Sequence, residues 1–126
     1  PLTNGAKLGI LHGSLAYCCQ DSEGQINETE SISAGLDYPS ISPMHCFLKD
    51  TKRARYISAT DEEALNAYKI VTKLEKINPS LEPSHAFAEA IKIAPKLSKD
   101  TIIIVNSCGD AKKDRDILKE RLGKIN

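Results

Sequence analysis

The spacing of hydrophobic positions divides the chain into an irregular first half and a regular second half. In residues 1–52, short apolar runs are separated by stretches of Gly, Ser, Pro and polar residues. The runs Lys7–His12 and Tyr17–Gln20 predict two brief strands, and Asp21–Gly24 after them predicts a turn. Between Ile32 and Pro43, the density of Pro, Gly and Ser predicts an ordered loop. We expect no independently folding unit from this half alone.

The second half, residues 53–126, shows helical periodicity. Arg55–Ala59 predicts a short strand. Thr60 then begins a helix, because Thr60 and Glu63 have the spacing of a capping box. Asn78–Pro79 ends this helix. Its predicted buried stripe follows helical spacing and consists of Ala64, Ala67, Tyr68, Val71 and Leu74.

A second helix, a buried strand and a closing helix are predicted next. Glu82–Ser84 opens the second helix with a proline in its first turn, and Pro95 ends it. Its predicted buried face consists of Phe87, Ala90, Ile91, Ala94 and Leu97. Thr101–Asn106 is a continuous apolar run, typical of a strand buried on both faces of a parallel sheet. Asp114–Lys124 predicts a charged helix. The apolar positions of that helix are Ile117, Leu118 and Leu122.

This order of elements predicts an α/β fold of three layers around a mostly parallel sheet. Two strands in the regular half are too few for a stable parallel sheet. The remaining strands must come from the first half, from a partner chain or from sequence outside these residues. We therefore expect residues 1–52, a loop-rich segment, and residues 53–126, a regular segment, to form one partial domain together.

Composition and charge exclude several classes of function. Seventeen basic residues balance seventeen acidic ones, so nothing general attracts nucleic acid or an anionic membrane. No apolar run approaches the roughly 18 residues of a membrane span. The four cysteines show no zinc-ligand spacing, and two of them are adjacent, which favours a reducing compartment. The chain begins at Pro1 without a methionine, which favours a fragment or a processed product.

Two places in the predicted fold are candidates for chemistry, because ligands of open α/β sheets bind at the carboxyl ends of strands. One is Ser107–Asp110, which also suits an ordinary turn after a strand. The other is Glu82, which is either a helix N-terminal acid or a crevice carboxylate whose pKa burial would raise. His85 lies one helical turn after Glu82, and base rates favour a buried, satisfied histidine. No Walker-A sequence, G-x-G-x-x-G fingerprint or G-x-S-x-G pattern occurs.

Several segments resemble one enzyme family, in order and along nearly the whole chain. They are Gly24–Pro39, Arg53–Tyr56, Ala59–Leu65, Pro79–Ala86 and Ile104–Asn106. Together they are similar to the carboxy-terminal portion of tryptophan synthase beta subunits, which are fold-type II pyridoxal phosphate enzymes. The resemblance implies an enzyme that joins indole to L-serine, forming L-tryptophan and water.

The resemblance also implies roles for individual residues. Glu82 matches the carboxylate beside the cofactor and the reacting carbon. Asp37 matches the acid that responds to the substrate hydroxyl and to closure. Cys108, followed by Gly109, falls where the family has a serine that hydrogen-bonds the pyridine nitrogen. A thiol is a weaker hydrogen-bonding partner than a hydroxyl.

Further implied features concern the cation, the substrate passage and the partners. Leu36, Tyr38 and Ser40 fall in the loop whose backbone carbonyls hold a monovalent cation, K⁺ or Na⁺. Leu11 and His12 fall where the family lines its indole passage. The family implies an alpha subunit or domain and a beta–beta homodimer as partners. The location expected is the cytoplasm, or a plastid for a plant or algal source.

The chain departs from the family at its last loop and in what it matches. The family runs Ser-Gly-Arg-Gly-Asp-Lys-Asp where this chain has Cys108–Asp114. No lysine here matches the one that forms the Schiff base, and no glycine-rich run matches the phosphate loop. We therefore expect these residues to be inactive alone. Two alternatives stay open: a standalone non-catalytic interaction or ligand-sensing module derived from this fold, and part of another fold-type II lyase.

Overall fold

The computed structural model describes residues 1–3 and 5–123, which form two compact units. The first unit contains residues 1–30 and 37–58. The second contains residues 31–36 and 59–126, of which 124–126 lie outside the description. The predicted end of the last helix at Lys124 therefore lies outside the described residues. Each unit has its own small core, and each is considered by itself.

The first unit is built on an antiparallel hairpin of β1 (Lys7–Leu11) and β2 (Ser14–Cys18). Its two turn residues, His12 and Gly13, have φ of +49° and +79°, as a two-residue type I′ turn requires. The prediction for the first strand is confirmed, whereas the second strand begins three residues earlier than predicted. The turn predicted at Asp21–Gly24 is confirmed, because the Gly24 amide donates to the Asp21 carbonyl at 3.4 Å.

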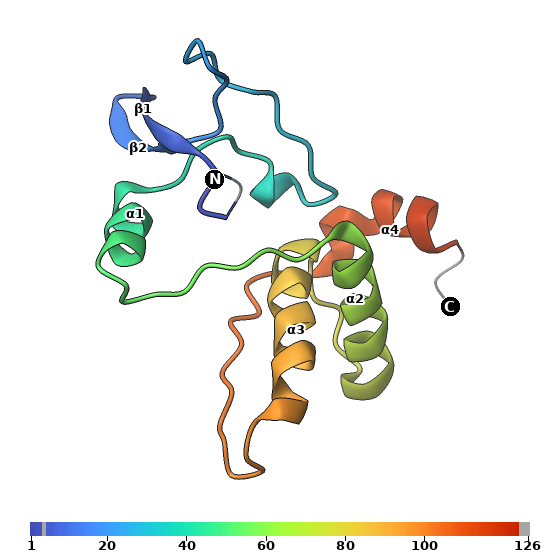
Figure 1. The fold of residues 1–126 in the computed structure, drawn as a ribbon. Helices are drawn as coiled ribbons and strands as arrows, with labels where there is room; N and C mark the ends of the chain where they lie inside the picture. Colours follow the sequence, from blue (N-terminus) through green and yellow to red (C-terminus); the bar gives the residue numbers. More distant parts are fainter. Residues whose placement is uncertain (4, 124–126) are drawn as a thin grey trace. The chain divides into compact units, whose positions relative to one another are not determined.

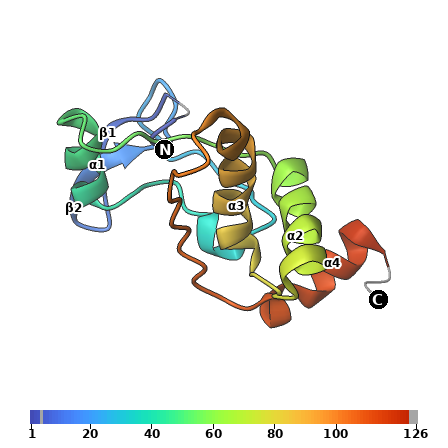
Figure 2. The same cartoon turned by 90° about the horizontal axis from the view of Figure 1, so that it is seen from below.

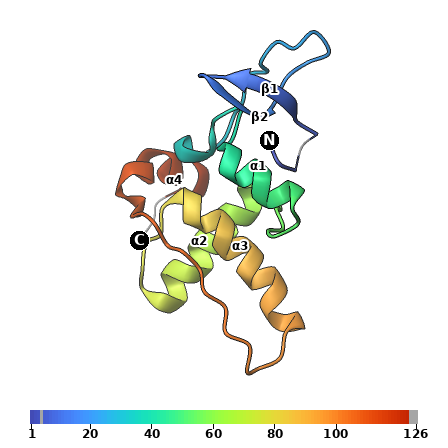
Figure 3. The same ribbon diagram turned by 90° about the vertical axis from the view of Figure 1, so that its left-hand side faces the viewer.

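A helix that the sequence analysis missed completes this unit. α1 (Pro43–Asp50) begins after Ser42, whose hydroxyl accepts a hydrogen bond from the Met44 amide. The proline at its first position has no N–H that would need a partner there. Figure 3 shows α1 beside the hairpin. The small core of the unit consists of Leu2, Ala16 and Cys46, with Tyr17, Ile41 and Tyr56 packed against them.

The second unit is helical. α2 (Asp61–Glu75) and α3 (Leu81–Ile93) lie side by side, and α4 (Arg115–Leu122) lies beside α2 (Figures 1 and 2). Three short 3₁₀ helices also belong to the described part of this unit: η1 (Ala34–Leu36), η2 (Ala94–Lys96) and η3 (Ala111–Asp114). The core consists of Ile32, Ala64, Tyr68, Leu81, Ala111 and Leu118, with Leu65, Ile117 and Leu122 packed against them.

The helix starts and ends are largely as predicted, but the buried faces are not. The capping box of Thr60 and Glu63 is confirmed, and α3 ends just before Pro95. Leu74, predicted to be buried, is 66% exposed. On α3 the buried residues are Leu81, Pro83, Ser84 and Ala88, whereas the predicted face of Phe87, Ala90, Ile91, Ala94 and Leu97 is half-buried or exposed. The helix is covered at its beginning rather than along the predicted stripe.

Two predicted strands are wrong for this chain. Arg55–Ala59 is irregular, and Thr101–Asn106 is an extended segment that belongs to no sheet. That segment follows η2 and runs back along α3 (Figure 1). Ile102 and Ile104 are 86% and 90% exposed. The physical reason is the lack of a partner: the hairpin is the only sheet in the described part of the chain, so parallel pairing is not observed there.

Candidate functional site

The candidate site is built around Glu82, the second residue of α3. The segment before this helix is held by the loop that precedes η3. The Ser80 amide donates to the Gly109 carbonyl at 3.1 Å, and the Ala111 amide donates to the Asn78 carbonyl at 3.0 Å. Leu81 is fully buried and anchors the first turn in the core. The start of α3 is therefore fixed by contacts with sequence about 30 residues away.

The Glu82 carboxylate uses one oxygen for protein contacts and leaves the other without a partner. Its Oε1 atom accepts hydrogen bonds from the Gly35 amide at 3.0 Å and from Lys113 Nζ at 2.8 Å. Oε2 is buried and has no partner, and the hydroxyl oxygens of Ser33 and Ser80 are in the same state. Such groups are costly unless something else satisfies them. They mark the place where a polar ligand group would be accepted.

Gly35 allows the close approach of its backbone to Glu82. A Cβ atom at position 35 would lie 2.5 Å from Glu82 Oε1, which is closer than any real contact. Gly109 is similar, because a Cβ atom there would lie 2.5 Å from Ser80 Oγ. A side chain at either position would therefore force Glu82 or Ser80 to move from the place that it has at the start of α3.

Two charged residues of η3 complete the surroundings of Glu82. Lys113 Nζ lies 2.7 Å from Asp114 Oδ1 as well as close to Glu82. The other oxygen of Asp114 accepts a hydrogen bond from the Leu81 amide at 2.8 Å. The Asp114 side chain is only 5% exposed, whereas that of Lys113 is 50% exposed. Lys113 therefore forms ion pairs with both carboxylates, Glu82 and Asp114.

The surroundings determine the charge state of Glu82. Desolvation raises the pKa of its carboxyl, but hydrogen bonds from Lys113, from the Glu82 amide and from the hydroxyls of Ser80 and Ser33 outweigh it. The net result lowers the pKa to about 2. The contribution of the two serines is the weakest of these, because neither hydroxyl oxygen has a hydrogen bond of good geometry. The alternative of a raised pKa is wrong, and Glu82 is a fixed anion at neutral pH.

The neighbouring candidates have simpler roles. His85 Nδ1 lies 2.7 Å from the Leu81 carbonyl, so it donates within its own helix and is the satisfied histidine that base rates favour. Cys108 is exposed with a free thiol. The sequence analysis missed Lys113 and Asp114, which contact Glu82 and Leu81 directly. The resemblance could have indicated both residues, because the family sequence Ser-Gly-Arg-Gly-Asp-Lys-Asp ends in the same Lys-Asp pair as Cys108–Asp114.

In the first unit, two predicted residues are in contact with each other. His12 Nδ1 lies 2.7 Å from the Tyr38 hydroxyl, and the two rings stack with centroids 5.8 Å apart. Leu11 is the last residue of β1, next to this pair. Ser40 is buried: its hydroxyl donates to the Tyr17 carbonyl at 3.1 Å and accepts from Cys18 Sγ at 3.3 Å. Side chains therefore fix both ends of the Tyr38–Ser40 segment.

The two remaining candidates belong to different units. Asp37 is exposed and belongs to the first unit. Leu36 closes η1 in the second unit and is 48% exposed. Within the described residues, no cluster of His, Cys, Asp and Glu suits a metal ion. Such a cluster would bind the ion through side chains only. The monovalent-cation site at the backbone carbonyls of Leu36, Tyr38 and Ser40 stays a prediction.

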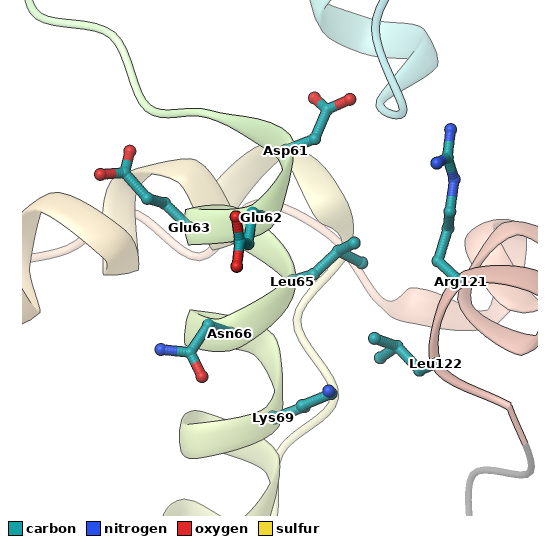
Figure 4. Close-up of a pocket in the computed structure, with 8 residues that line it drawn as sticks. All are labelled: Asp61, Glu62, Glu63, Leu65, Asn66, Lys69, Arg121 and Leu122. Atoms are coloured by element: carbon teal, nitrogen blue, oxygen red, sulfur yellow. The ribbon is translucent and has the colours of Figure 1, made fainter.

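The second unit also has an open cleft of about 590 Å³ between α2 and α4. Figure 4 shows acidic side chains from the first turn of α2 and, across the cleft, Arg121 and Leu122 from α4. The lining residues are Asp61, Glu62, Glu63, Leu65, Asn66, Lys69, Arg121 and Leu122. None of the predicted site residues lies in this cleft.

Among the described helices, none is long and apolar enough to cross a membrane.

Comparison with known proteins gives a consistent set of relatives. No family model matches the chain. It is 54% identical over 114 residues to the tryptophan synthase beta chain of Chromobacterium violaceum. This alignment covers 90% of this chain and 28% of that protein. The beta chain of Bordetella petrii is 50% identical over 117 residues, covering 93% and 29%. That of Cereibacter sphaeroides is 54% identical over 119 residues, covering 94% and 29%. The chain thus spans less than a third of the length of these relatives.

Proposed function

This chain belongs to the tryptophan synthase beta chain family, and on that premise we propose that it is the carboxy-terminal part of an enzyme that condenses indole with L-serine to L-tryptophan and water. The observation that carries the proposal is the identity of 50% to 54% over nine-tenths of the chain. The resemblance of the segments around Asp37 and Glu82 supports it. The Schiff-base lysine and the phosphate loop would be supplied by sequence outside these 126 residues.

The residues near Glu82 fit a polar cofactor. Oε2 of Glu82 and the hydroxyls of Ser33 and Ser80 are buried without partners, so they are suited to a ligand with hydrogen-bonding groups. The exposed thiol of Cys108 and the adjacent Gly109 would face the pyridine ring. Pyridoxal phosphate, when bound, supplies the electron sink that permits loss of the serine hydroxyl. Glu82 orients the ligand as a fixed negative charge, and Asp37 accepts a hydrogen bond from the substrate hydroxyl.

The first unit supplies the predicted passage and part of the cation loop. Leu11 and His12 would line the route of indole. The backbone carbonyls of Tyr38 and Ser40, with that of Leu36, would hold K⁺ or Na⁺. The buried, doubly hydrogen-bonded Ser40 side chain supports a fixed loop. An alpha subunit and a second beta chain are the partners we propose, in the cytoplasm, where the four free cysteines would stay reduced.

The finer fold that we propose is a mostly parallel sheet completed by sequence outside these residues. The support is the exposed run Thr101–Asn106, whose apolar side chains and free strand edges need partners. Strands buried on both faces have this composition. The hairpin of the first unit is antiparallel and does not supply such partners.

The proposal is tested on the full-length polypeptide with pyridoxal phosphate, L-serine and indole. We expect tryptophan to form, and we expect residues 1–126 alone to form none. Asp37→Asn should lower kcat by roughly 100-fold, as loss of a positioned acid does, whereas Asp21→Asn, in an exposed turn, should not. A full-length polypeptide that forms no tryptophan but deaminates L-threonine would assign another lyase. An intact natural polypeptide of this length without activity would assign a binding module.

A further inference from the structure

Lys113 occupies a position that links the candidate site to the core. Its Nζ atom lies 2.8 Å from Glu82 Oε1 and 2.7 Å from Asp114 Oδ1. The two carboxylates would repel each other without the cation between them. Asp114 cannot move away, because it is almost fully buried and also accepts the Leu81 amide. The lysine is therefore held at a fixed place by Asp114 and holds Glu82 in turn.

The hydrogen bonds of Glu82 involve only one of its two carboxylate oxygens. Oε1 accepts hydrogen bonds from both the Gly35 amide and Lys113. These two donors hold the carboxylate in place through that oxygen. Oε2 is buried and without a partner, as are the hydroxyl oxygens of Ser33 and Ser80. A ligand group that reaches this atom must therefore present a hydrogen-bond donor.

We propose that Lys113 is a positioning residue, which fixes Glu82 as an anion and presents its Oε2 atom to an N–H or O–H group of the reacting ligand. Asp114 acts with it by holding the lysine and the first turn of α3. The proposal rests on the proposed function for the identity of the ligand, a hydroxy amino acid. The contacts themselves are independent of that function.

The charges near Glu82 support a role in orientation rather than in proton transfer. Among the described residues, the charged group that contacts the Glu82 carboxylate is Lys113, and Lys113 in turn contacts Asp114. The pKa of Lys113 is itself raised, because hydrogen bonds and charges of Asp114 and Glu82 outweigh its desolvation. Removal of Lys113 would leave desolvation opposed by weaker donors, so the pKa of Glu82 would rise. A protonated Glu82 carboxyl would donate a hydrogen bond as well as accept one, so it would no longer act only as an acceptor for the ligand.

The kinetic test uses the full-length polypeptide with three variants. Lys113→Gln removes the charge, Lys113→Arg retains it, and Lys112→Gln is the matched control, because the described contacts of Glu82 do not include Lys112. We expect Lys113→Gln to lower kcat at neutral pH by roughly tenfold and to add an acidic limb to the profile of kcat against pH. The arginine variant should restore the wild-type profile. A merely structural lysine would change the melting temperature without a new limb.

A second measurement does not depend on activity. Glutamate labelled with ¹³C at the side-chain carboxyl, assigned with Glu82→Gln, reports the ionisation of Glu82 by NMR. We expect this signal to stay ionised at pH 4 in the wild type and in Lys112→Gln, and to titrate above pH 4 in Lys113→Gln. The same titration in Lys113→Gln as in Lys112→Gln would overturn the proposal. If the wild type forms no tryptophan, the proposed function fails, and the NMR titration still decides whether Lys113 fixes the anion.

Discussion

Two segments of the second unit, the start of α3 and the isoleucine run Thr101–Asn106, have similar apolar side chains in very different surroundings. Leu81 at the start of α3 is fully buried, whereas Ile104 in the run is 90% exposed. Leu81 packs in a core made from α2, α4 and the residues around η1 and η3. The run pairs with no strand among the described residues.

Burial of an apolar side chain depends on whether its packing partners belong to the same unit. The start of α3 is complete because its partners, Ile32, Ala64 and Leu118, belong to the same unit. The run has the composition of a buried strand, yet composition alone does not bury a side chain. A strand becomes buried inside a sheet only when neighbouring strands pair with its backbone and other elements cover its faces. Four measurements test this difference between the two segments.

The largest effect is expected at the buried end of the comparison. Leu81→Ala should lower the free energy of unfolding by about 3 kcal/mol, because it removes a fully buried side chain and leaves a cavity. Urea unfolding followed by circular dichroism at 222 nm measures it. Ile104→Ala is the matched control and should cost less than about 0.5 kcal/mol. Equal effects of the two substitutions would break the comparison.

The next effect concerns pH at the start of α3. The pKa of Glu82 falls from its ordinary value of 4.5 to about 2 on folding. Its stabilising contribution is therefore fully present above pH 4.5 and is lost as the pH falls through 2. We expect Glu82→Gln to cost about 2 kcal/mol at pH 7, after allowance for partial exposure of the side chain. The cost should vanish near pH 2 in urea unfolding, and a cost independent of pH would contradict the assignment.

A smaller effect is expected at the start of α2. Thr60 Oγ1 accepts the Glu63 amide at 3.2 Å, and the Thr60 amide donates to Glu63 Oε2 at 2.8 Å. Thr60→Ala should lower the free energy of unfolding by about 1 kcal/mol. Thermal unfolding by circular dichroism measures it, with Thr101→Ala in the extended run as the comparison. If Thr101→Ala costs as much as Thr60→Ala, the cap contributes nothing.

The smallest effect on the stability of this chain is expected in the exposed isoleucine run. Ile104→Ser should change the stability of this chain by less than about 0.5 kcal/mol, because the side chain already meets solvent. In the full-length polypeptide the same substitution should cost about 3 kcal/mol if the run lies inside a parallel sheet. Urea unfolding of both forms gives the two values. A negligible cost in the full-length polypeptide would count against the proposed sheet.

The predictions that succeeded depended on neighbouring residues. The capping box of Thr60 and Glu63 and the end of α3 before Pro95 involve contacts within one turn, so the sequence shows them directly. α1 was missed although Ser42 and Pro43 give a standard start signal, because the surrounding Pro and Ser suggested a loop. The local sequence around Ser42 and Pro43 therefore did indicate a helix start, but the nearby Pro and Ser residues favoured the loop interpretation.

The predictions that failed depended on distant residues. Helical periodicity placed Leu74 in a buried stripe, but in the structure this side chain is 66% exposed because nothing in the described unit covers it. The bond between Lys113 and Glu82 spans 31 positions, and no periodic pattern predicts such a contact. The site residue Glu82 was found by resemblance and by its place at a helix start. Its low pKa was not, because desolvation, which alone would raise the pKa, is outweighed mainly by a hydrogen bond from Lys113, which lies in another segment.

The exposed isoleucine run has a consequence for handling the protein. Ile102–Val105 has high strand propensity and contains neither charge nor proline, as in segments that stack into intermolecular sheets. Lys99 and Asp100 just before it are the kind of flanking charges that limit such association. If the partner strands lie upstream, a ribosome has made them before this run emerges, so its exposure in the cell is short. Produced without them, the run stays exposed, and we expect the isolated segment to reach the insoluble fraction of cells far more than the full-length polypeptide.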